Sequence, residues 1–226
     1  MTTVLVTGFE PFAGEPVNAA WEAVSALLSQ DRADTVDISN PVATRSGVQI
    51  YVRQLPTAFG QARDILTKAI EQVRPQVVVC FGEAGGRSAI SVERVGVNLD
   101  HARIADNAGN QPVETKSVEG APDAYFSRLP VGDLIAHLRG AGLPAEESWS
   151  AGTFVCNHVL YGLMHLLQTK PWSDECVAAG FVHVPYLPEQ AARHEGQPSL
   201  GREECARAVG SIVDYLVEWV QRSVQP

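Results

Sequence analysis

The segment QVVVCFG, residues 76–82, most restricts what this chain can fold into. Its apolar, largely β-branched residues run without a polar break, a pattern typical of a strand that is buried on both faces. A strand of this kind needs a covering layer on each side of its sheet. We therefore expect an α/β protein in which helices flank the sheet on both sides.

Apolar runs and helical patterns alternate along the rest of the chain. We predict further strands at 3–9, 48–56, 89–99, 146–150 and 176–184, and helices after Asn18 and after Thr57 and at about 131–141, 156–169 and 200–221. Asn and Thr are residue types that cap helix starts. The strand at 89–99 alternates apolar and polar residues, which favours a mixed sheet. The predicted fold class is α/β, an α/β/α sandwich with a twisted mixed sheet. With 226 residues and 45% hydrophobic content, residues 1–226 are expected to form a single domain.

Residues 106–123, DNAGNQPVETKSVEGAPD, interrupt the alternation. They have little apolar periodicity and several turn-forming residues, which fits either a long loop or a hairpin arm that reaches away from the core. We predict a protrusion at this place.

Charge and composition disfavour several function classes. There are 17 Lys and Arg against 26 Asp and Glu, for a net charge of −9, and no basic block stands out, so we expect no nucleic-acid partner. The apolar runs fall far below the roughly 18 residues of a membrane span. The start MTTVLVTGF lacks a basic region and a cleavage site. A soluble, cytoplasmic protein without a membrane partner is expected.

Four cysteines are scattered without CxxC or Cys/His metal spacing: Cys80, Cys156, Cys176 and Cys205. This spacing argues against both a zinc site and a disulfide framework, so the thiols are expected to be reduced. Most such thiols are small core residues.

Four loops follow predicted strands or precede a predicted helix, where ligands of open α/β sheets bind. They are GFEPFAGEPVN, GEAGGR, SAGTFVCN and HVPYLPEQ. Cys156 and His183 lie in two of them. A cysteine in the first turn of a helix meets the positive end of the helix dipole and free backbone N–H groups, which lower its pKa and can stabilise an oxyanion. Alternatively Cys156 packs beneath that helix as an inert thiol, which the helical pattern alone favours.

A thiol hydrolase also needs an imidazole and an acid to orient it. His183 follows an apolar strand and is expected at its C-terminal end, whereas His158 and His165 lie on the helix after the cysteine and suit surface or partly buried positions. For the acid, Glu83 on a glycine-rich loop and Glu93 in an apolar strand both remain open. The cost of burying an unpaired carboxylate favours Glu93 modestly.

Five segments are together similar to one known family: GFEPF, GGRSAISVERVGVN, ARIADN, SAGTFVCN and FVHVPYLPEQ. In this order, between residue 4 and about 190, they resemble the pyroglutamyl peptidase type I family of cysteine peptidases, also called pyrrolidone carboxyl peptidases. The resemblance implies that Glu93, Cys156 and His183 form a catalytic triad. It also implies hydrolysis of an N-terminal 5-oxoproline (pyroglutamyl) residue from peptides through a thioester, with no metal or cofactor.

The resemblance implies a substrate pocket as well. Phe9 and Phe12 match residues that hold the lactam ring, Thr57, Glu83, Ile104, Phe154 and Val155 match other pocket positions, and Arg103 matches a residue near the oxyanion. The lactam is neutral, so an acidic anchor for an ammonium group would be left unpaired. Glu83 departs from the family, where glutamine is frequent; its carboxylate would either accept the lactam N–H or repel a thiolate. Ala105 replaces a proline of the family pattern.

Two other functions stay open. The family shares its general α/β architecture with nucleoside phosphorylases, so a phosphorylase-like transferase is one alternative, for which GEAGGR is a weak phosphate-site candidate. A catalytically idle binding protein that keeps the pocket is the other. Family members are commonly tetramers, so a homotetramer is expected, with 106–123 as a plausible contact arm.

Overall fold

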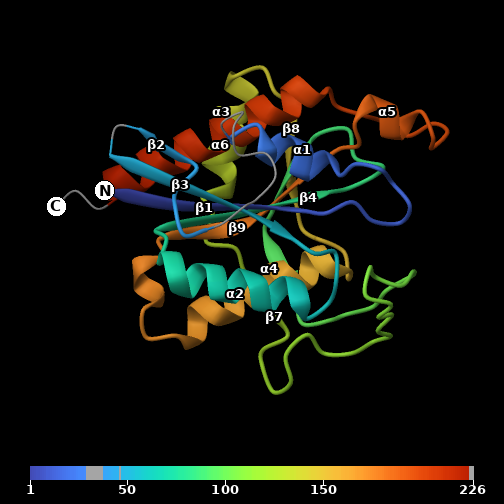
Figure 1. Ribbon diagram of the computed structural model, residues 1–226, viewed down its shortest axis with the longest axis horizontal. Coiled ribbons are helices and arrows are strands. Elements are labelled where there is room, and N and C mark those ends of the chain that lie inside the picture. Colours follow the sequence, from blue (N-terminus) through green and yellow to red (C-terminus); the bar gives the residue numbers. More distant parts are fainter. Residues whose placement is uncertain (29–37, 46, 224–226) are drawn as a thin grey trace.

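A computed structural model describes residues 1–28, 38–45 and 47–223; the other residues of the predicted 1–226 domain lie outside the described residues. A seven-stranded sheet has the order β2-β3-β1-β4-β9-β5-β8, and β6 and β7 form a separate pair (Figure 1). The strands are β1 (Thr2–Phe9), β2 (Ala43–Arg45), β3 (Val48–Leu55), β4 (Val77–Glu83), β5 (Ile90–Glu93), β6 (Val95–Val97), β7 (Ala124–Phe126), β8 (Ala145–Ser148) and β9 (Ala178–Val184). The helices are α1 (Ala19–Ser25), α2 (Gln61–Val73), α3 (Val131–Gly140), α4 (Val155–Thr169), α5 (Pro188–Ala191) and α6 (Arg202–Ser223), with a 3-10 turn at Ser173–Glu175.

The sheet is mixed, as predicted. Its centre is parallel, with β1 between β3 and β4 and with β4 beside β9. Two pairings are antiparallel, β2 with β3 and β5 with β9, and β8 then pairs parallel to β5. Parallel neighbours bring the ends of β1, β4 and β9 to one edge of the sheet, where the loops after them meet.

Helices cover the sheet on both faces, as Figure 1 shows: α1, α3 and α6 lie on one side, α2 and α4 on the other. Strand β4 explains this layering at the level of single residues. Val77, Val79 and Phe81 belong to the core beneath α1 and α6, whereas Val78 and Cys80 belong to the core beneath α2 and α4. Because successive side chains of a strand point to opposite faces, an unbroken apolar run fills both cores. The predicted α/β/α sandwich is confirmed.

Two local predictions were wrong. The single strand predicted at 89–99 is two strands in different sheets, since the chain leaves the main sheet at Arg94 and β6 runs across α4 to pair with β7. Gly96 permits this path: a Cβ there would lie 2.9 Å from the backbone nitrogen of Tyr161. Thr57 does not cap α2, which begins after Gly60 at a φ of 71°; its hydroxyl donates instead to the carbonyl of Glu10, at 3.0 Å.

A long irregular excursion, residues 98–123, connects β6 to β7 and contains the predicted 106–123 segment (Figure 1). An isolated antiparallel bridge joins Asp100 to Thr115 near its base. The buried Asn98 amide donates to the carbonyls of Val118 and Ala121 and accepts from the N–H of Val118. Side-chain bonds therefore take the place of a strand ladder here. No helix in the described part of the chain combines the length and apolar character needed to cross a membrane.

Candidate active site

A cavity of about 300 Å³ opens where the loops after β1 and β4 meet the start of α4. Its lining residues come from separate parts of the chain: Phe9, Phe12, Asn18, Thr57, Glu83, Ala84, Gly85, Arg87, Ser150, Ala151, Gly152, Phe154, Cys156 and His183. All four loops predicted from strand and helix ends contribute to this wall. The cavity therefore holds groups that are far apart in sequence, including a thiol and an imidazole.

Cys156 is the second residue of α4, and its half-buried side chain faces the cavity. Phe154 precedes the helix at the N-cap position, and its apolar side chain makes no capping bond to the free N–H groups of the first turn. Gly82 lets the sulfur approach β4, since a Cβ there would lie 2.9 Å from Sγ and 2.7 Å from the ring of Phe181. Gly82 is the register partner of His183 in the neighbouring strand β9. The close approach of helix and strand thus places the thiol beside the imidazole.

The thiol is not acidified in this structure, contrary to the sequence-based expectation for a helix start. Burial raises the pKa of Cys156 to about 12, and the negative charges of Glu93 and Glu83 act in the same direction. Arg87 opposes them with a smaller effect. At neutral pH the sulfur is therefore protonated, and a base must remove its proton when it reacts.

His183 is the base that the geometry offers. Its Nδ1 lies 2.7 Å from Oε1 of Glu93, and both side chains are buried. Burial lowers the pKa of His183, while the bond to Glu93 opposes that effect. For Glu93, burial raises the pKa, but the hydrogen bond and charge of His183, together with the charge of Arg87, hold it below its usual range. A carboxylate that accepts at Nδ1 leaves Nε2 of a neutral imidazole free to take a proton.

Arg87 is a site residue that the sequence analysis missed. Its Nη1 donates to Oε1 of Glu93 at 2.7 Å, and its Nη2 donates to the carbonyl of Ser150 at 2.9 Å. The guanidinium thus joins the acid to the turn that precedes α4. One sequence signal pointed to it, since Arg87 ends the GEAGGR loop beyond a buried strand.

Aromatic rings form one wall of the cavity. Phe12 and Phe154 lie 5.9 Å apart between ring centroids, and Phe9 packs on Phe181 at 6.1 Å. Thr57 lines the same space. These rings make a flat apolar slot beside the thiol, which suits a planar neutral group.

Glu83, the last residue of β4, also lines the cavity and is held by two donors. Its Oε2 accepts from the N–H of Ala19 at 2.7 Å and from Nε2 of Gln190 at 2.8 Å. Burial raises its pKa, although both hydrogen bonds counteract that effect. Gln190 was not predicted, because its contact with Glu83 spans 107 positions.

Of the residues predicted for the substrate pocket and the oxyanion, three do not line the cavity in the described structure. The side chain of Val155 is fully buried in the core beneath α4. Ile104 is 47% exposed, and Arg103 is exposed beside it on the excursion. The remaining predicted residues meet around the cavity, with Glu93 directly behind His183.

Known proteins are similar to this chain in sequence and architecture. The family model described as pyroglutamyl peptidase matches residues 2–218. Pyrrolidone-carboxylate peptidases from Cupriavidus necator and Gloeobacter violaceus are 51% and 50% identical to this chain, each over 94% of it and over 92% and 96% of their own lengths.

Solved structures of similar proteins have the same fold as this chain. The crystal structure of pyroglutamyl peptidase I from Bacillus amyloliquefaciens superposes with a TM-score of 0.83 at 39% identity, covering 93% of this chain and 92% of that one. A mutant pyrrolidone carboxyl peptidase from Pyrococcus furiosus gives 0.85 at 36% identity, covering 97% and 100%. The resemblance and the fold class predicted from the sequence are both confirmed. The chain belongs to the pyroglutamyl peptidase family, a family of cysteine peptidases.

Proposed function

We propose that this chain removes N-terminal pyroglutamate from peptides with Cys156 as nucleophile, His183 as general base and acid, and Glu93 as the group that orients the imidazole. One observation carries the proposal. A single cavity holds a thiol at a helix start and an imidazole whose Nδ1 is bonded to a buried carboxylate, beside a slot of aromatic rings. This is the arrangement that thiol acyl transfer requires.

Acylation begins with a neutral thiol, since burial keeps the pKa of Cys156 high. Nε2 of His183 takes the thiol proton as Sγ attacks the carbonyl carbon of the pyroglutamyl residue. The backbone N–H groups in the first turn of α4 stabilise the oxyanion. His183 then gives the proton to the leaving amine, the C–N bond breaks, and a thioester remains on Cys156.

Deacylation repeats these steps with water. Nε2 of His183 removes a proton from a water molecule, the hydroxide adds to the thioester carbonyl, and the C–S bond breaks. The sulfur recovers its proton from the imidazole, and free pyroglutamate leaves. Glu93 stays ionised throughout and holds the ring in one tautomer.

Substrate choice follows from the slot. The lactam is flat and neutral, so it fits between Phe9, Phe12 and Phe154, whose apolar rings would remove hydration from an ammonium group. Because Oε2 of Glu83 already accepts two bonds, Oε1 is the oxygen that accepts the lactam N–H. Arg103, Ile104 and Val155 are assigned to the oxyanion and the pocket by family resemblance alone; for the first two, the excursion would have to move toward the cavity.

Hydrolysis of a chromogenic pyroglutamyl amide tests the proposal. Wild type should release the chromophore, and Cys156→Ala should not. Cys176→Ala is the matched control, because that thiol is buried in the same core away from the cavity. Activity that survives Cys156→Ala would contradict the assignment. A wild type that binds the lactam without cleaving the amide would indicate the idle binding protein, and phosphate-dependent cleavage of nucleosides would indicate the transferase.

The sequence-based expectations about assembly and location remain proposals. A homotetramer is supported by the family resemblance and by the exposed excursion, where Val113 is 64% exposed. A cytoplasmic location is supported by the four cysteines, each of which is free. A single domain is supported by one sheet that carries both cores. Light scattering, cell fractionation and a single cooperative unfolding transition test these three points.

A further inference from the structure

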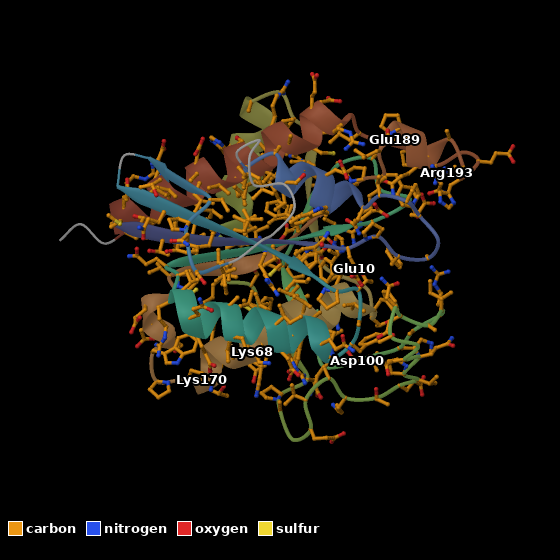
Figure 2. All side chains as sticks on the ribbon, in the orientation of Figure 1. Glu10, Lys68, Asp100, Lys170, Glu189 and Arg193 are labelled. Carbon is orange, nitrogen blue, oxygen red and sulfur yellow. The ribbon has the colours of Figure 1, made fainter. Side chains whose placement is uncertain are left out.

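A second histidine–carboxylate pair lies behind the cavity, and the reaction steps above do not use it. Nδ1 of His158 lies 2.8 Å from Oδ2 of Asp100, and both side chains are almost fully buried. The hydroxyl of Ser117 donates to Oδ1 of Asp100 at 2.5 Å. On the other edge of the ring, Nε2 of His158 accepts from the N–H of Gly60 at 3.2 Å. Figure 2 labels Asp100 where the excursion passes the start of α2.

The roles of the two ring nitrogens are therefore fixed. Nε2 accepts from a backbone N–H, so it carries no proton, and Nδ1 is the donor to Asp100. A buried carboxylate is costly unless its oxygens are paired, and here each oxygen has one donor. The chain maintains this costly carboxylate as the partner of His158, which lies two residues after Cys156 in the sequence.

One side of the pair is tied to the start of α4. Asn157 is fully buried. Its Oδ1 accepts from the N–H of Val97, and its Nδ2 donates to the carbonyls of Val97 and Leu99. The hydroxyl of Thr153 donates to the carbonyl of His101, whose N–H donates to the carbonyl of Thr153. Residues on both sides of Cys156 are thus bonded to the segment 97–101, and Asp100 extends the same attachment.

The other side reaches the substrate slot. Gly60 ends the loop 57–60, in which Thr57 lines the cavity. Within this loop the ring of Phe59 packs edge-on against His158 at 5.5 Å and against Phe154, a wall residue, at 5.3 Å. Phe59 itself does not line the cavity, so it supports the wall from behind.

We infer that Asp100 and His158 form a positioning pair that holds the loop 57–60 and the aromatic wall in place relative to the first turn of α4. The pair touches no substrate atom, and its effect is on how tightly the lactam ring is held. This inference rests on the proposed function, because it concerns binding in the same slot. Loss of the pair should weaken ring binding and leave the chemistry of Cys156 and His183 unchanged.

The decisive variant is His158→Gln, which cannot donate to Asp100 and accept from Gly60 in the same geometry. KM for a pyroglutamyl amide should rise about tenfold or more while kcat stays within about threefold. Inhibition by 2-pyrrolidone, which carries the ring alone, should weaken by a similar factor. The pH limbs of kcat should keep their positions. His165→Gln is the matched control, since that histidine lies on the same helix and bonds Tyr125 at 3.0 Å, away from the cavity.

Two further variants separate this role from a general loss of stability. Asp100→Asn retains an acceptor for Nδ1 of His158 and should keep KM within about threefold of wild type. Asp100→Ala removes that acceptor and should raise KM. Phe59→Leu keeps the pair intact but removes the ring that reaches Phe154, and it should raise KM as His158→Gln does. The inference is overturned if folded His158→Gln or Phe59→Leu has wild-type KM and 2-pyrrolidone affinity, or if His165→Gln raises KM equally. Absence of hydrolysis by wild type would instead refute the proposed function.

Discussion

Replacing Arg87 by methionine tests how the acid of the triad is held. The change removes the positive charge and both donors but keeps most of the side-chain volume. In the structure those donors contact Oε1 of Glu93 at 2.7 Å and the carbonyl of Ser150 at 2.9 Å. Glu93 is fully buried, while Arg87 is 24% exposed. The variant therefore leaves a buried carboxylate with the imidazole as its remaining charge-bearing partner.

The expected loss follows from these contacts. A hydrogen bond to a charged group contributes about 1.5–3 kcal/mol, and solvent near the partly exposed guanidinium reduces that value. If the loss falls on the transition state at about 1.4 kcal/mol per decade, kcat/KM should decrease roughly 10-fold to 50-fold. The positive charge of Arg87 also affects the pKa values of the triad residues beside it. Arg87 helps to lower the pKa of Glu93 and of His183, so its removal raises both. His183 must be neutral to take the thiol proton, and the acid limb of kcat/KM should move to higher pH.

The assay is the pH profile of kcat/KM with a chromogenic pyroglutamyl amide. Arg87→Lys keeps the charge but not the bridge, so its acid limb should stay near that of wild type although its rate falls. Arg94→Met serves as a control, since Arg94 pairs with Glu147 at the surface at 2.5 Å and should change neither rate nor profile. A folded Arg87→Met with wild-type kcat/KM and an unshifted acid limb would refute the reasoning.

Three other predictions concern the same cavity. Gly82→Ala places a Cβ 2.9 Å from Sγ of Cys156 and 2.7 Å from the ring of Phe181. We therefore expect kcat to fall at least tenfold, and the free energy of unfolding, measured by thermal unfolding, to fall by about 1–3 kcal/mol. Wild-type values for both would show that the sulfur does not lie against β4. Glu83→Gln removes a negative charge that raises the thiol pKa, so the alkaline limb of kcat/KM should move to lower pH, and an unchanged limb would mean that Glu83 is uncharged there. The rate at which iodoacetamide alkylates Cys156 should keep rising to the highest pH at which the protein stays folded, because burial raises the thiol pKa to about 12; a plateau near neutral pH would indicate a thiolate already formed beside His183.

The layered fold was predictable because its signals are local. The apolar run of β4 identifies a strand with two buried faces, and Asn18 caps α1 by accepting from the N–H groups of Ala20 and Trp21. The break at Arg94 was not predictable, because the apolar and polar alternation continues across it. What turns the chain there is the packing of Gly96 against α4, a contact between distant segments.

The site shows the same division. Strand and helix ends suggested Cys156 and His183 as candidates. The cost of burying a carboxylate favoured Glu93 modestly as their partner, and family resemblance selected it over Glu83. The contact of Gln190 with Glu83 spans 107 positions and that of His158 with Gly60 spans 98. Neither leaves a pattern in a local window, since each depends on how the layers meet. His158 was expected at a surface or partly buried position for this reason, whereas its side chain is almost fully buried.

The start of α4 differs from that of α1 in a way that bears on substrate selection. Asn18 occupies the first free N–H groups of α1, whereas Phe154 leaves those of α4 without a side-chain acceptor. A serine or aspartate at position 154 would stabilise the helix by about 1 kcal/mol, but its oxygen would compete with the reacting carbonyl for the same donors. In the proposed reaction, the substrate oxygen accepts from these N–H groups in the place of a side-chain cap. A molecule that fills the slot but places no carbonyl oxygen near the first turn of α4 leaves these N–H groups without that acceptor. The uncapped helix start therefore selects against ligands that cannot be cleaved.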